Sequence, residues 1–182
     1  MTPAEQLLSF TGTLNYQGNP IVINYHRLKK LILDEDTSSE ARNDYMEELG
    51  DVPQHLTTAP NNKPELFYFE RTGDRYVIHV IGSGRYSGQT LSMEGPHRTL
   101  SADSHNASAR FTVGVDFFDH DENLTRENIL SDEMDVAIRS EGRTYITNYS
   151  TPQAPPKFTD DDEDDSEIAT FRLKIIERNI EP

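Results

Sequence analysis

Three segments of this 182-residue chain share a short apolar pattern, in which a phenylalanine is followed two positions later by another apolar residue. They begin at Phe67, Phe111 and Phe171, so the pattern recurs after 44 and then after 60 residues. A similar lead-in, glycine and arginine followed by tyrosine, occurs at 84–86 and 142–145. Apolar residues at every second position are typical of a strand with one buried face. Their recurrence at such intervals predicts a domain built from repeated units of several strands.

The chain divides around these three endings into three imperfect repeats. We place the repeats at about 7–70, 75–115 and 135–177 of a single domain that covers residues 1–182. Between the second and third repeats lies a polar connection, and a strongly acidic loop at 159–167 interrupts the third. The interval of about forty residues or more suits repeats of four short strands with loop insertions.

The first repeat contains a predicted hairpin and a predicted helix. Alternating apolar residues at 10–16 and β-branched residues at 21–25 flank a Gln-Gly-Asn-Pro turn, and the apolar residues at 28–33 predict a further strand. From residue 37 the sequence Thr-Ser-Ser-Glu resembles a capping box, and apolar residues then recur at helical spacing. We therefore expect one short helix over 39–49, inserted into the first repeat.

A Gly-Arg-aromatic hairpin, a short middle strand and a closing aromatic-x-aliphatic strand together resemble the repeats of β-trefoil proteins, especially fascin-like domains. The resemblance covers residues from about 7 to 177 and implies an all-β fold with threefold internal symmetry. A β-sandwich or another barrel remains the alternative. If the fold is a β-trefoil, the core should contain Phe10, Tyr16, Ile23, Phe69, Val77, Phe111, Val113, Ile138, Phe171 and Leu173.

Composition excludes several classes of function. The chain carries 32 acidic and 17 basic residues, a net charge of -15, which disfavours binding to nucleic acid and to anionic membranes. It contains no cysteine, so it has no disulfide and no thiolate metal site. The first residues lack the basic and apolar regions of a signal peptide, and no apolar run is long enough to span a membrane. We expect a soluble, cytoplasmic protein, with leaderless secretion as an alternative.

The most concentrated charge in the sequence is an acidic run in the third repeat. Carboxylates this close together repel one another, so we expect a solvated loop. Binding of Ca²⁺ or of a basic partner is the alternative, although the run lacks the glycine and the ligand order of a calcium-binding loop. The residues concerned are Asp160, Asp161, Asp162, Glu163, Asp164 and Asp165.

No motif of the sequence predicts an enzyme. Ser101, Asp103 and His105 are the residue types of a catalytic triad, but residues two positions apart in a strand lie about 6.8 Å from each other, which is too far for hydrogen bonds. The members of a triad come from separate segments of the chain. None of the six histidines forms a His-x-x-x-His pair. We therefore predict no catalytic residue, no metal site and no cofactor.

The resemblance to β-trefoils suggests binding functions, and this chain departs from each family. Ricin-B-type lectins use Gln-x-Trp repeats and Kunitz-type inhibitors carry disulfides, whereas this chain has neither tryptophan nor cysteine. Mycocypin-like inhibitors, which are poor in cysteine, remain compatible with its composition. Fascin-like domains crosslink actin through basic patches, which a net charge of -15 argues against.

Our leading hypothesis is a non-enzymatic, lectin-like module that binds carbohydrate through aromatic side chains. The candidate residues are Tyr86, His97, Tyr145 and Tyr149. One alternative is a protease inhibitor that presents the loop 51–65 or the loop 150–167. The other is an acidic interaction protein that binds basic partners or the cytoskeleton through residues 160–167. The sequence does not predict an oligomeric state.

Overall fold

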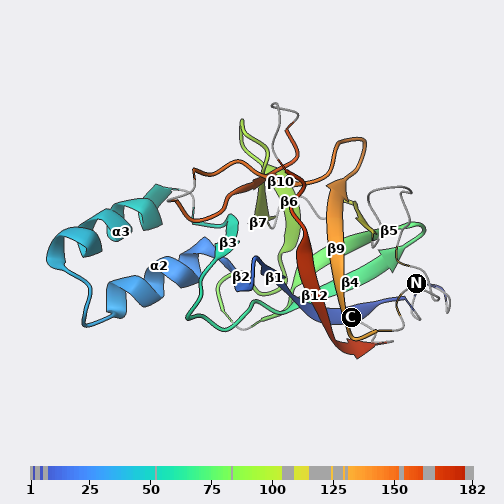
Figure 1. Cartoon of the computed structure of the whole chain (residues 1–182), viewed down its shortest axis with the longest axis horizontal. Coiled ribbons are helices and arrows are strands. Elements are labelled where there is room, and N and C mark those ends of the chain that lie inside the picture. Colours follow the sequence, from blue (N-terminus) through green and yellow to red (C-terminus); the bar gives the residue numbers. More distant parts are fainter. Residues whose placement is uncertain are drawn as a thin grey trace.

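The computed structural model describes residues 2, 5, 8–51, 53–82, 84–103, 109–114, 124, 129, 131–151, 154–161 and 167–178. Strands dominate this part of the chain, and Figure 1 shows them gathered into one body from which two helices project. In chain order the elements are β1 (Phe10–Tyr16), β2 (Asn19–Ile23), α2 (Asn24–Leu33), α3 (Ser39–Asp51), β3 (Leu56–Thr58), β4 (Phe67–Thr72), β5 (Arg75–Val80), β6 (Thr90–Glu94), β7 (Thr99–Asp103), β8 (Phe111–Gly114), β9 (Glu133–Ser140), β10 (Thr147–Asn148), β11 (Phe158–Thr159) and β12 (Phe171–Arg178).

Six of the strands close into an antiparallel barrel. The ring runs β1–β4–β5–β8–β9–β12 and returns to β1, so each of its strands has two neighbours. The other six strands form the hairpins β2–β3, β6–β7 and β10–β11. Each run of four strands thus supplies two barrel strands and one hairpin, which is the β-trefoil arrangement that the sequence predicted. The three runs span 10–72, 75–114 and 133–178.

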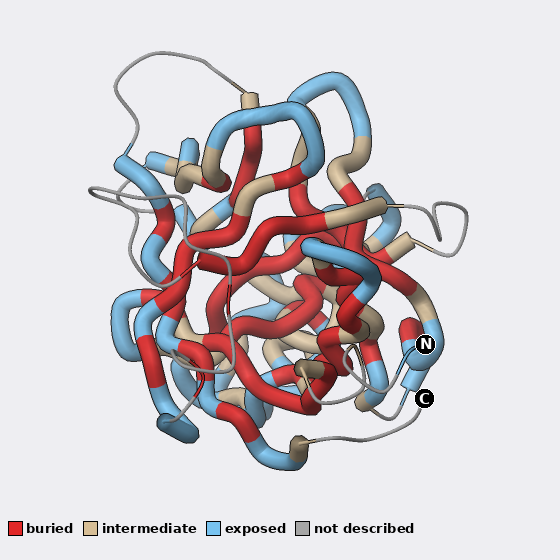
Figure 2. The backbone as a smooth tube through the Cα atoms, turned by 90° about the vertical axis from the view of Figure 1, so that its right-hand side faces the viewer, coloured by how far each residue is buried: buried red, intermediate tan, exposed pale blue. Residues whose placement is uncertain are grey.

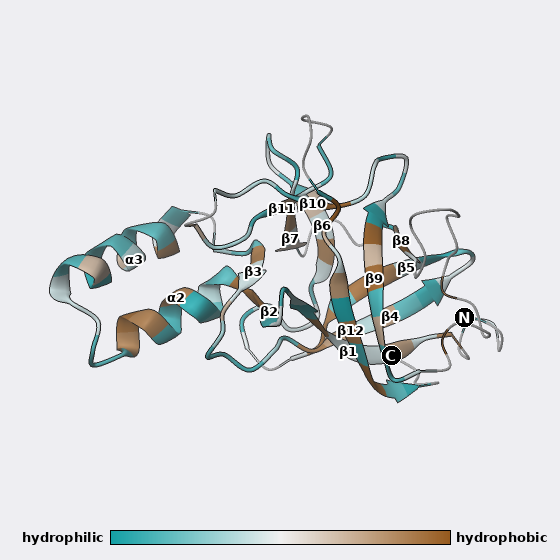
Figure 3. Cartoon of the chain, in the orientation of Figure 1, coloured by the Kyte–Doolittle hydropathy of each residue, from teal (hydrophilic) through white to brown (hydrophobic). Residues whose placement is uncertain are grey.

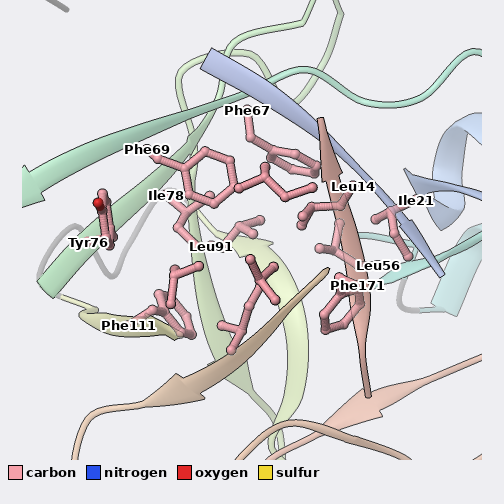
Figure 4. Close-up of a cluster of buried hydrophobic side chains, with 14 of the residues drawn as sticks. Leu14, Ile21, Leu56, Phe67, Phe69, Tyr76, Ile78, Leu91, Phe111 and Phe171 are labelled. Atoms are coloured by element: carbon pink, nitrogen blue, oxygen red, sulfur yellow. The ribbon is translucent and has the colours of Figure 1, made fainter. Parts of the chain in front are cut away.

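The three repeated phenylalanines occupy equivalent places in this fold. Phe67, Phe111 and Phe171 are the first residues of β4, β8 and β12, the closing strands of the three runs, and each is at most 1% exposed. Their side chains belong to one apolar cluster inside the barrel (Figure 4). All ten residues predicted for the core are buried, and Figure 2 shows the buried backbone running through the centre of the molecule.

A pair of helices, here called the helical arm (residues 24–51), lies between β2 and β3. The predicted helix is present as α3, but the strand predicted at 28–33 is wrong, because these residues belong to α2. Leu28, Leu31 and Ile32 have the spacing of one helix face, and Leu28 is fully buried. No residue of α3 is buried, and Figure 3 shows that helix as largely hydrophilic. No helix of the described residues is long and apolar enough to cross a membrane.

Gly12 lies where β1 is bonded to β12 on one side and to β4 on the other, next to a shift in the β1–β12 register. A β-carbon at this position would lie 2.9 Å from the backbone oxygen of Lys174. We expect Gly12→Ala to lower the free energy of unfolding by about 1–3 kcal/mol, because the barrel backbone must move to relieve the clash. Urea denaturation measures the loss.

Gly50 provides the matched control for that substitution. It lies in α3, and a β-carbon there would meet nothing within 4 Å. Gly50→Ala should leave stability unchanged or raise it by up to about 1 kcal/mol, since alanine favours the helix. Equal effects of the two substitutions would show that the barrel tolerates a side chain at Gly12.

Candidate functional site

A groove of about 580 Å³ opens where three parts of the fold meet. Its walls come from the end of α3, from the β6–β7 hairpin over residues 94–101, and from the two ends of the β10–β11 connection at Tyr149 and Lys157. The volume is within the range of small-molecule binding sites. Each of the three repeats therefore contributes to its lining.

Two aromatic rings lie side by side at this groove. The ring centroids of His97 and Tyr149 are 6.4 Å apart and the ring planes are inclined by 30°. His97 is exposed and Tyr149 is 41% exposed, so solvent reaches both rings. The Tyr149 hydroxyl is hydrogen-bonded to the Thr99 hydroxyl at 3.1 Å, and Thr159 Oγ1 donates to the His97 carbonyl at 2.7 Å. The first bond holds the Tyr149 side chain in place, and the second holds the backbone at His97.

The remaining lining of the groove is polar. Glu48 of α3 accepts hydrogen bonds from Asn24 and Arg27 of α2, which fix the direction of its carboxylate. Asp51 and Lys157 are exposed, and they add a second carboxylate and an ammonium. The groove therefore offers hydrogen-bond donors and acceptors around an aromatic surface. Among the described residues no group of three or more acidic or histidine side chains could hold a metal ion.

A partly buried ion pair supports the turn that carries His97. Arg98 Nε and Nη2 donate to the two carboxylate oxygens of Asp160, each at 2.7 Å, and Ser140 Oγ donates to the same carboxylate. The bond to Asp160 raises the pKa of the Arg98 guanidinium. Arg98 itself has φ of 44°, a conformation that is uncommon for a residue with a side chain. The ion pair holds this turn against the third repeat.

Asp160 was predicted as part of a solvated acidic loop, but its side chain is fully buried in this ion pair. Its carboxylate is bonded within the fold and is not available to Ca²⁺ or to a basic partner. Asp161 is half-buried, and its backbone N–H donates to Thr159 Oγ1 at 3.1 Å. The other predicted residues of the run, Asp162, Glu163, Asp164 and Asp165, lie outside the described residues.

The other two predicted aromatic residues lie away from the groove. Tyr86 is 5% exposed and packs edge-on against Tyr25 of α2, and burial raises the pKa of its phenol. Tyr145 is half-buried, and the Arg139 guanidinium lies 5.3 Å from the centre of its ring. Tyr86 thus attaches the helical arm to the second repeat. Of the four predicted aromatic residues, the structure brings together His97 and Tyr149.

Comparison with solved structures supports the fold. The chain is similar to winged bean albumin 1, a β-trefoil protein, with a TM-score of 0.50 and 10% sequence identity over 92% of this chain and 91% of that chain. At this identity the likeness concerns the fold alone. No protein-family model matches the sequence, and no curated protein does.

Proposed function

We propose that this β-trefoil is a non-enzymatic, lectin-like module that binds carbohydrate in the groove at His97 and Tyr149. The adjacent, solvent-accessible rings are the observation that carries the proposal. The C–H face of a sugar ring is apolar and packs against an aromatic side chain, while the hydroxyls at its edge need hydrogen-bond partners. The groove combines both kinds of contact.

The protease-inhibitor alternative has less support. Among the described residues of the first candidate loop, 51–65, Pro53, residues 55–59 and Glu65 are buried, so the exposed positions are Asp51 and the short stretch 60–64. In the second, 150–167, residues 158–160 are buried. An inhibitor needs an extended exposed loop to enter the cleft of a protease. The described parts of both segments are therefore short for that purpose.

The alternative of an acidic interaction protein rested on residues 160–167. The burial of Asp160 removes one carboxylate from that run. Binding to a basic partner through exposed charges would weaken strongly as salt is added, because ions screen such contacts. Sugar binding through ring packing and hydrogen bonds would change little with salt. Salt dependence therefore separates the two functions.

A glycan array with the purified protein tests the proposal, followed by titration of the best-bound sugar. We expect Tyr149→Ala and His97→Ala each to weaken binding at least tenfold, because each removes half of the aromatic surface. Tyr149→Phe keeps the ring and loses the bond to Thr99, so its effect should be smaller. Binding should persist in EDTA.

Tyr45→Ala is the matched control, since Tyr45 is a half-buried tyrosine of α3 that does not line the groove. It should bind sugar as the unmodified protein does. An array without any bound glycan would refute the proposed function. Equal losses in Tyr45→Ala and Tyr149→Ala would place the binding site elsewhere.

A further inference from the structure

A second cavity, of about 370 Å³, lies on the α2 side of the β10–β11 connection. Its walls come from three places: α2 between Arg27 and Asp34, the segment 58–62 that follows β3, and residues 154–156. In Figure 1 the described parts of the β10–β11 connection extend toward the helical arm. Tyr149 and Lys157 line the groove described above, whereas 154–156 line this one.

Half of the twelve residues that line this cavity are apolar. Five of its twelve lining residues are alanine or proline, and Leu31 of α2 adds a larger apolar side chain. Alanine and proline lose almost no side-chain entropy when a ligand packs against them. Backbone bonds fix the walls further, since Ala59 N donates to Pro20 O at 3.1 Å and Ala154 N to Thr151 O at 3.0 Å.

The charged groups at this cavity come from α2 and from Asp34, the residue that follows it. Lys30 Nζ donates one hydrogen bond to the backbone oxygen of Asn61, at the rim, and an ammonium has three N–H donors. Arg27 Nη2 is paired with Glu48 at 2.8 Å, which holds the guanidinium toward α3. Asp34 Oδ1 accepts from Asp36 N at 3.0 Å, so its carboxylate caps the following turn. Lys30 is therefore the cation best placed to donate to a bound ligand.

We propose that this cavity binds a small apolar molecule that carries one carboxylate. The apolar body would pack between Leu31 and the proline walls, and the carboxylate would accept hydrogen bonds from the Lys30 ammonium. The lining holds two cations, Arg27 and Lys30, against one carboxylate, Asp34, and this local excess of positive charge in a chain with a net charge of -15 favours an anion over a neutral or basic ligand. This site is separate from the groove, and the inference does not depend on sugar binding.

Isothermal titration with octanoate and 4-phenylbutyrate tests the proposal, with octanol as the neutral counterpart of octanoate. We expect both carboxylates to bind at a single site, with octanoate at least tenfold tighter than octanol. Lys30→Met removes the charge and keeps the length of the side chain, so it should reduce that preference at least tenfold. Ala154→Trp places a large ring at an exposed position of the wall and should weaken both octanoate and octanol.

Lys29→Met is the matched control. Lys29 is the adjacent lysine, lies over the Tyr25 ring and does not line the cavity, so its removal should leave octanoate binding unchanged. His97→Ala should also leave it unchanged, which separates this site from the groove. Failure of both carboxylates to bind, equal effects of the two lysine substitutions, or unchanged binding in a folded Ala154→Trp variant would overturn the proposal.

Discussion

Replacing Arg98 by alanine should destabilise the protein by about 3 kcal/mol, the lower end of the cost of breaking a buried ion pair. The reason is the position of Asp160, whose side chain is fully buried and would lose the two hydrogen bonds that Arg98 donates to its carboxylate. The side chain of Arg98 is 32% exposed, so water entering the vacated space offsets part of the cost. Urea denaturation at neutral pH measures the change in the free energy of unfolding.

Arg172→Ala is the matched control for this prediction. Arg172 pairs with Asp135 at 3.3 Å, but both side chains are about half exposed or more, and such pairs contribute about 0–1 kcal/mol. A double-mutant cycle of Arg98→Ala with Asp160→Ala isolates the coupling between the two charges. Equal losses for the two arginine substitutions would show that the Arg98–Asp160 pair stabilises no more than a surface pair.

Phe171→Ala should cost about 3–5 kcal/mol, the usual range for removing a buried phenylalanine. Phe171 contacts Phe158 at 5.1 Å and Tyr16 at 5.9 Å between ring centres, and its backbone pairs with β1 and β9. Its ring therefore packs where the first and third repeats meet, and its loss leaves a cavity that the surrounding strands cannot fill. The shift of the urea midpoint measures the effect.

Ile176 lies on the same strand and is 56% exposed, so Ile176→Ala should change stability by no more than about 0.5 kcal/mol. If Phe171→Ala behaved like Ile176→Ala, the repeated phenylalanine would not be a core residue. Phe67→Ala and Phe111→Ala should resemble Phe171→Ala, since all three begin closing strands of the barrel.

The sequence predicted the barrel well because its strands alternate apolar and polar residues and because each of the three repeats ends in the same apolar pattern. It failed at α2 for a physical reason. The apolar residues between Leu28 and Leu33 form a short cluster that suits either a strand or one face of a helix, and periodicity does not separate the two over such a length. The burial of Leu28 and the packing of α2 against α3 and the β2–β3 hairpin decide the outcome.

The candidate site was only partly predictable. His97 and Tyr149 were selected as aromatic residues near turns, but nothing local in the sequence indicates that they lie together. Arg98 and Asp160 are 62 positions apart, and a run of acids gives no sign that its first member is buried. Glu48 and Asp51 reach the groove only because the helical arm brings the first repeat beside the other two. These contacts depend on tertiary structure.

The pairing of β1 with β12 has a consequence for how the chain folds. The two strands are bonded along their whole length, from Phe10 with Arg178 to Tyr16 with Phe171, and they join the beginning of the described fold to its end. Bringing together segments so distant in sequence costs loop-closure entropy and slows folding. During synthesis the earlier hairpins can form one after another, but the ring stays open until β12 has left the ribosome. The barrel can therefore close only after the last of its strands has been synthesised.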